Sequence, residues 1–146
     1  MTYDDYTVRK LFYSRFGFNY DDFFNNQEEF LRASQYLKDN GCSIEIYAYA
    51  WKTHSSLVNM ALNCKPVFGV LKYDKYGTLT FYEYNKKGKL VKGISSGNRL
   101  FADTKEEAIK AYNDLIDEYL KKLDKMREWA NSYRILEEEN NESSLR

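Results

Sequence analysis

The stretch VFGVLKYDKYGTLTFYEYNKKGKL, residues 67–90, repeats one pattern: apolar and aromatic residues, then a short polar segment that ends in glycine. Asp74 and Gly77 in the first copy match Asn85 and Gly88 in the second. Asp and Asn open tight turns, and Gly accepts the left-handed backbone that follows. Two copies are too few for a solenoid, so the repeat predicts hairpins. We expect an antiparallel meander of three strands, at 67–73, 78–84 and 89–94.

Upstream of the meander, residues 43–51 alternate strictly, which predicts a half-buried strand. One face would carry Ile44, Ile46, Ala48 and Ala50, and the other Glu45, Tyr47, Tyr49 and Trp51. Asn26 with Glu29 resembles a capping box, and Gly41 provides a stop, so a helix is expected over 27–39. A shorter helix capped by Asp5 or Thr7 should end near Phe16, and another is expected between Thr53 and Pro66.

Downstream of the meander, residues 98–102 favour a last strand, and Asp103 or Thr104 caps a long helix over 104–136. Its apolar stripe alternates in steps of three and four residues: Ile109, Tyr112, Ile116, Tyr119, Leu123, Met126, Ala130 and Tyr133. We expect the first half of the stripe to cover the sheet. The second half, with Trp129, would project, because such a helix is longer than a compact body.

These elements predict a single α+β domain over 1–146, in which an antiparallel meander sheet is packed by helices. Its parts are a helical and aromatic N-terminal part with one strand (1–64), a basic meander (65–102), the long amphipathic helix (104–136) and an acidic tail (137–146). With 43% hydrophobic residues and no apolar run of membrane-spanning length, we expect a soluble cytoplasmic protein with no membrane partner. The first six residues do not resemble a secretory signal, so Cys42 and Cys64 are expected to be reduced.

The formal net charge of zero conceals segregated charge. Residues 65–99 contain eight basic and two acidic side chains, a local charge of +6, whereas residues 1–64 and 103–146 carry −2 and −4. Lysines and tyrosines are interleaved on the predicted hairpins, a pattern that single-stranded nucleic acid binding uses. The candidate nucleic-acid residues are Lys75, Tyr76, Lys86, Lys87, Lys89 and Lys92. The alternative interpretation is that these lysines keep the sheet edges soluble.

The sequence offers little for catalysis. His54 is the only histidine, and no spacing fits a metal site, so neither a metal nor a cofactor is predicted. The glycines at 93 and 97 lack the Gly-Lys-Ser/Thr ending of a phosphate loop. Most of the paired carboxylates precede or open helices, where they act as caps. We therefore predict a protein that is not an enzyme.

Three functions remain open from the sequence. The first is a protein-protein interaction module that binds through Leu123, Met126, Trp129 and Tyr133. Glu137, Glu138 and Glu139 would either join this surface against a basic partner or form a solubilising tail. The residue bias fits AT-rich codons, so its specific version is a phage or mobile-element inhibitor of a host defence nuclease or nucleoprotein complex, of the anti-CRISPR type. A homodimer through the distal helix is a further version. The alternatives are a nucleic-acid-binding accessory protein and a small enzyme or nucleotide-binding or sequestering protein with His54 near its site.

Overall fold

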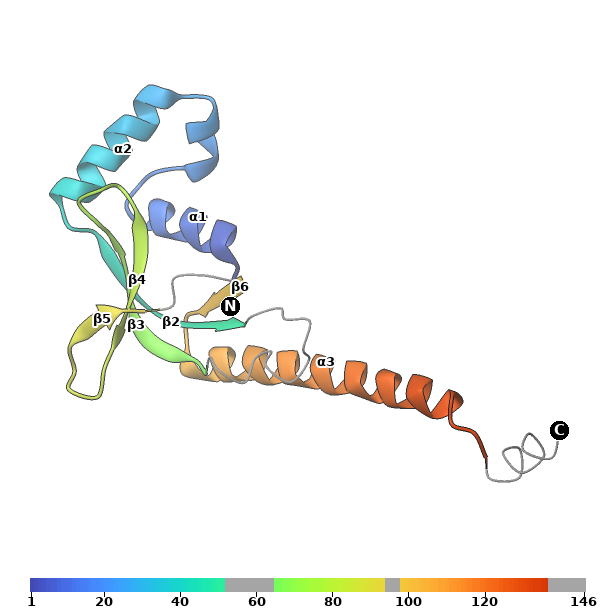
Figure 1. Cartoon of the computed structure of the whole chain (residues 1–146). Coiled ribbons are helices and arrows are strands. Elements are labelled where there is room, and N and C mark those ends of the chain that lie inside the picture. Colours follow the sequence, from blue (N-terminus) through green and yellow to red (C-terminus); the bar gives the residue numbers. More distant parts are fainter. Residues whose placement is uncertain (52–64, 94–97, 137–146) are drawn as a thin grey trace.

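In a computed structural model of the chain, residues 1–51, 65–93 and 98–136 are described (Figure 1). The fold is α+β, as the sequence predicts, and is built on an antiparallel sheet of six strands in the order β1-β6-β2-β3-β4-β5. The strands are β1 (Thr2–Tyr3), β2 (Ser43–Trp51), β3 (Val67–Tyr73), β4 (Leu79–Tyr84), β5 (Leu90–Lys92) and β6 (Asn98–Ala102). The helices are α1 (Asp5–Arg15), the 3₁₀ turn η1 (Tyr20–Phe24), α2 (Gln27–Asp39) and α3 (Lys105–Ser132).

The predicted meander is strands β3, β4 and β5, and both of its turns use the same chemistry. Asp74 Oδ1 accepts hydrogen bonds from the backbone N–H groups of Tyr76 and Thr78, both at 2.9 Å. Asn85 Oδ1 accepts in the same way from Lys87, at 2.9 Å, and Lys89, at 3.0 Å. The glycines that follow have φ of +82° and +76°, so the repeat in the sequence is a pair of matching hairpins.

The main core lies between one face of the sheet and helices α1 and α2 (Figure 1). Its largest fully buried side chains come from four strands and both helices: Val8, Phe12, Leu37, Ile46, Leu71, Phe81 and Phe101. The predicted cap of α2 is present, since Asn26 Oδ1 accepts from the Glu29 N–H at 3.1 Å. The cap of α1 differs from the expectation, because Asp4 holds the Thr7 N–H at 2.7 Å and Thr7 lies inside the helix.

Helix α3 covers the end of the opposite face of the sheet, and there two predicted residue environments are wrong. Alternation placed Tyr49 on the half-exposed face, yet it is fully buried, with its ring 5.7 Å from that of Tyr112. The apolar stripe placed Ile109 in the core, but Ile109 is 41% exposed and Ala108 is buried instead. The buried face of α3 follows Ala108, Tyr112 and Tyr119, which lie on one side of the helix at 100° per residue, and Ile109 falls beside this face rather than on it.

Helix α3 ends at Ser132, four residues before the predicted end at 136. The Ser132 hydroxyl donates to the carbonyl of Trp129, and the side-chain oxygen of Asn131 accepts from Arg134. Such local bonds compete with helical hydrogen bonding and favour termination. No helix in the described ranges has the length and apolar character that a bilayer span requires.

Candidate functional site

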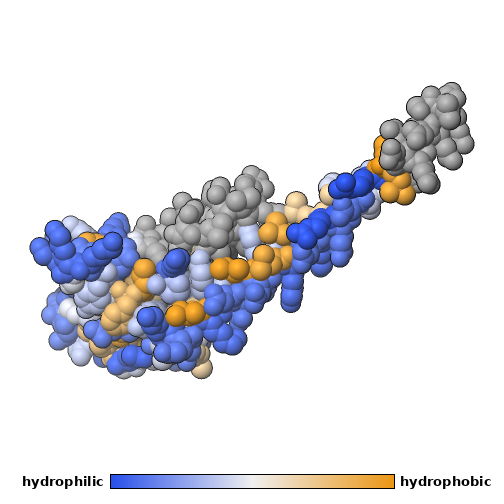
Figure 2. All heavy atoms as spheres, turned by 90° about the horizontal axis from the view of Figure 1, so that it is seen from below, coloured by the Kyte–Doolittle hydropathy of each residue, from blue (hydrophilic) through white to orange (hydrophobic). Residues whose placement is uncertain are grey.

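The distal part of α3 extends beyond the sheet, and every side chain from Leu120 to Leu136 is exposed. Four of the predicted partner residues lie on it, with exposed fractions rising along the helix: Leu123 38%, Met126 50%, Trp129 64% and Tyr133 70%. The rings of Trp129 and Tyr133 contact each other edge to face at 5.1 Å. Figure 2 shows apolar side chains along α3 among strongly polar neighbours. We call Leu123, Met126, Ala130 and Tyr133 the distal stripe.

Basic side chains border the distal stripe on both sides. At 100° per residue, Lys122 lies on one border of the stripe beside Trp129, while Arg127 lies on the other. The two acidic residues of this segment, Asp124 and Glu128, fall on the opposite side of the helix together with Lys121 and Lys125. The distal stripe is therefore an apolar strip with basic borders.

The structure separates the candidate nucleic-acid lysines into two groups. Lys75 and Tyr76 occupy the β3–β4 turn, where the Lys75 ammonium lies 5.1 Å from the centroid of the Tyr76 ring. Lys86, Lys87 and Lys89 occupy the β4–β5 turn at the other end of β4, about 20 Å away at the usual rise of a strand. The two turns therefore do not form one continuous basic surface.

A cluster that the sequence interpretation missed lies on the face of the sheet opposite the main core. Strands β2 and β3 pair Tyr47 with Phe68. Strands β3 and β4 pair Gly69 with Glu83, so the next position in the same register places Phe68 beside Tyr84. Ring centroids are 4.8 Å apart in the first pair and 5.7 Å in the second, where the rings are stacked. Phe68 is 38% and Tyr84 39% exposed. We call these three residues the aromatic row.

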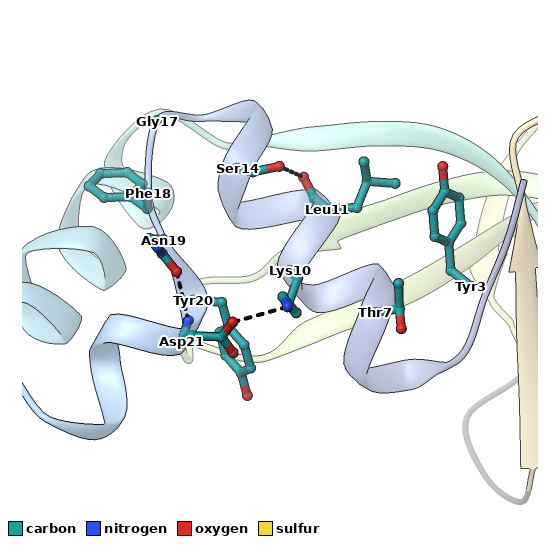
Figure 3. Close-up of a pocket in the computed structure, with 10 residues that line it drawn as sticks. All are labelled: Tyr3, Thr7, Lys10, Leu11, Ser14, Gly17, Phe18, Asn19, Tyr20 and Asp21. Atoms are coloured by element: carbon teal, nitrogen blue, oxygen red, sulfur yellow. Dashed lines mark hydrogen bonds and ion pairs between the residues drawn. The ribbon is translucent and has the colours of Figure 1, made fainter.

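A hollow of about 630 Å³ lies between α1 and the segment that leads into η1 (Figure 3). Its charged groups are already paired, since Lys10 Nζ lies 3.0 Å from Asp21 Oδ2 and the Tyr6 hydroxyl donates to Asp21. These two donors lower the pKa of Asp21. The two charged side chains that line this hollow, Lys10 and Asp21, are therefore paired with each other rather than with a ligand.

Within residues 1–51, 65–93 and 98–136, the buried titratable groups are tyrosines and the thiol of Cys42. The Tyr73 hydroxyl donates to Ser34 Oγ at 2.8 Å inside the core. Cys42 is a buried free thiol, and burial raises its pKa, which lowers its nucleophilicity. Among the residues that the structure describes, no group of three or more His, Cys, Asp or Glu side chains could hold a metal.

Several predicted features lie outside the described residues: His54, Cys64, the helix expected between Thr53 and Pro66, the loop at 94–97, and Glu137, Glu138 and Glu139 of the tail. Comparisons with protein-family models, curated proteins and solved structures found no match to this chain. Two surfaces therefore remain as candidate sites, the distal stripe and the aromatic row.

Proposed function

We propose that this chain is a non-enzymatic protein-binding module whose binding element is the distal part of α3. The observation that carries the proposal is the continuous exposure of the distal stripe together with Trp129. An amphipathic helix that inserts its apolar face into a groove is recognised through side chains at i, i+3 and i+7, the spacing of Leu123, Met126 and Ala130. Trp and Tyr, which stand at 129 and 133, are the aromatic residues most often found at binding hot spots.

The basic borders specify the chemistry of the partner. If two copies of the distal stripe paired with each other, Lys122 and Arg127 would face basic borders of the second copy, and like charges at a helix interface are destabilising. An apolar groove with an acidic rim matches both the stripe and its borders. The partner that we propose is therefore a different protein with such a groove, and a homodimer is the competing outcome.

The specific partner that we propose to test first is a nuclease of a host defence system, of the kind that anti-CRISPR proteins inhibit. Support for this choice comes from the small size of the chain and its residue bias towards AT-rich codons. A direct readout is cleavage of a target DNA by the purified nuclease, with and without the protein.

Site-specific photocrosslinking tests the binding surface. A photoreactive phenylalanine analogue replaces Met126 on the distal stripe, and a matched variant carries it at Glu128 on the opposite side of the same helix. We expect a single covalent heterocomplex from position 126 and none from position 128. Once the captured partner has been purified, its affinity for the Trp129→Ala variant should be at least about tenfold lower than for the unmodified chain, the size of a hot-spot loss.

Three outcomes would contradict the proposal. Equal crosslinking from both positions would mean that the helix has no preferred face. Crosslinking of the chain only to itself would show a homodimer instead. Unchanged affinity of a folded Trp129→Ala variant would place the binding surface elsewhere.

A further inference from the structure

We infer that the open face of the sheet, centred on the aromatic row Tyr47, Phe68 and Tyr84, binds single-stranded nucleic acid. This surface is separate from the distal stripe, so the inference does not depend on the proposed protein partner. The row crosses β2, β3 and β4, and strand pairing continues it to Leu90 on β5, which is 43% exposed. Four adjacent strands thus present one apolar strip to solvent.

Exposed aromatic rings on a sheet are suited to unpaired bases. Every base has a π face, so stacking on aromatic side chains binds single strands with little regard to sequence. A duplex keeps its bases stacked inside and cannot use such a strip. Phe68 and Tyr84 are too exposed to be core residues, and helices α1 and α2 cover the other face of the sheet.

Lysines surround the aromatic row at the ends of the same strands. Tyr84 pairs with Leu90 as the last pair before the β4–β5 turn, which contains Lys86, Lys87 and Lys89 and no acidic residue. Lys92 pairs with Tyr82 one row away on this face. Exposed Lys65 precedes β3, the strand that contains Phe68. These five ammonium groups lie where a phosphate backbone would run if its bases stacked on the row.

Two features limit where a single strand of nucleic acid would lie on this face. Helix α3 covers the neighbouring row, where Tyr49 is buried against Tyr112, so the surface is closed on the side of β6. Glu45 is the exposed acid that the register places on this face of β2, away from the lysine-rich turn. A single strand would therefore lie across β3, β4 and β5, with its phosphates toward the β4–β5 turn.

Fluorescence anisotropy of the full-length protein with labelled 20-nucleotide probes tests this inference. The probes are one mixed sequence as DNA, the same sequence as RNA, and its DNA duplex. We expect at least one single strand to bind tenfold or more tightly than the duplex. Phe68→Ala with Tyr84→Ala should lower the affinity by about tenfold or more, the scale of one lost stacked base.

The repeated hairpins provide a matched control. Lys86→Glu with Lys87→Glu should weaken binding and reduce the slope of log affinity against log salt by about 1.4, or about 0.7 for each phosphate that is no longer neutralised. Lys75→Glu with Tyr76→Ala changes the equivalent turn at the other end of β4 and should leave affinity within about twofold.

Any of three results overturns the inference: no binding of either single strand at 50 mM salt, equal affinity for the duplex, or an equal loss in the control hairpin variant. Because Phe68→Ala could unfold the sheet, circular dichroism accompanies each titration. The exposed-turn lysine variant decides the question if the aromatic variant is unfolded, since unchanged affinity in a folded Lys86→Glu, Lys87→Glu protein contradicts the proposed path of the phosphates.

Discussion

Gly69 shows how a single missing side chain shapes the core. It lies on buried β3, paired with Ile46 on one side and Glu83 on the other. A Cβ atom there would collide with the carbonyl oxygen of Tyr82 and come within 2.8 Å of the Phe81 ring and of the Glu83 Cα. Two of these obstacles are backbone, so no rotamer change relieves them. The absence of a side chain is therefore required for β3 and β4 to pair.

Gly69→Ala should destabilise the fold by roughly 3 kcal/mol, at the upper end of overpacking effects, because β3 and β4 must separate. The free energy of unfolding from urea denaturation measures the change. Gly17→Ala is the matched control: nothing lies within 4 Å of its Cβ, and its φ of +87° should cost only about 1 kcal/mol. Equal decreases in the free energy of unfolding of the two variants would mean that crowding around Gly69 does not add to the cost of the substitution.

Tyr3 makes the stability of the fold sensitive to alkaline pH. Its hydroxyl donates to Asp103 Oδ2 at 2.6 Å, and burial together with this carboxylate raises its pKa from 10.0 to about 12. Burial also raises the pKa of Tyr49 to about 12. Below pH 10 these hydroxyls are protonated in both folded and unfolded chains. Above pH 10 the unfolded chain ionises first, so stability should fall as pH rises toward 12.

The measurement is the urea midpoint at pH 8, 9, 10 and 11. We expect a level value up to about pH 9 and a progressive decrease beyond it. Tyr3→Phe removes one of the ionising groups and should show a smaller decrease between pH 10 and pH 11 than the unmodified chain. A decrease of the same size in both proteins would assign the pH dependence to other groups.

At the scale of single elements, the sequence predicted best where a local rule sets the structure. Helix α2 and strand β2 have the predicted bounds, because the Asn26 cap, the glycine stop and strict alternation act within a few residues. The buried face of β2 was only partly right. Tyr49 is covered by α3, more than 50 residues later in the chain, and periodicity alone contains no information about such coverage.

The aromatic row marks the same limit for the candidate site. The predicted turn at 74–77 would have been enough to align Phe68 with Tyr84 across the β3–β4 hairpin, so two of the three residues of the row were accessible from the sequence. Tyr47 pairs with Phe68 through strands joined by a long connection, which sets no register. The distal stripe was predictable, because an overlong amphipathic helix needs only its own periodicity to be recognised.

Helix α3 depends on its cap at Thr104, whose hydroxyl oxygen accepts from the Glu107 N–H at 3.2 Å. Thr104→Ala removes this acceptor and should cost about 1 kcal/mol in the free energy of unfolding. Thr104→Ser keeps the oxygen and should stay close to the unmodified chain. Thermal unfolding by circular dichroism compares the three proteins, and equal midpoints for the Ala and Ser variants would contradict a capping role.

At the scale of the whole molecule, the two proposed surfaces are separate. The distal stripe begins where α3 leaves the sheet, whereas the aromatic row lies toward β5 beyond the part that α3 covers (Figure 1). Their charges are also separate: the lysines of the β4–β5 turn are exposed at the end of the sheet, whereas the basic residues of α3 border an apolar strip. Loss of one surface should therefore leave the other functional.

Removing residues 121–146 tests this separation. The interactions described within 121–136 are local to the helix, such as Arg127 with Asp124 and Trp129 with Tyr133. The thermal midpoint should therefore shift by no more than about 2 °C. Single-stranded nucleic acid affinity should persist and crosslinking to a protein partner should disappear. Loss of both activities in a folded truncated protein would show that the surfaces are coupled.

Small-angle X-ray scattering on the same pair of proteins tests the projection of α3 itself. A compact chain of 146 residues has a radius of gyration of about 15 Å, but the 28 residues of α3 alone span about 42 Å. The full chain should therefore scatter as a monomer with a radius clearly above 15 Å, and the truncated chain should approach about 14 Å. A doubled mass for the full chain but not for the truncated chain would identify a second copy on the removed segment, and a radius near 15 Å would mean that α3 folds back onto the body.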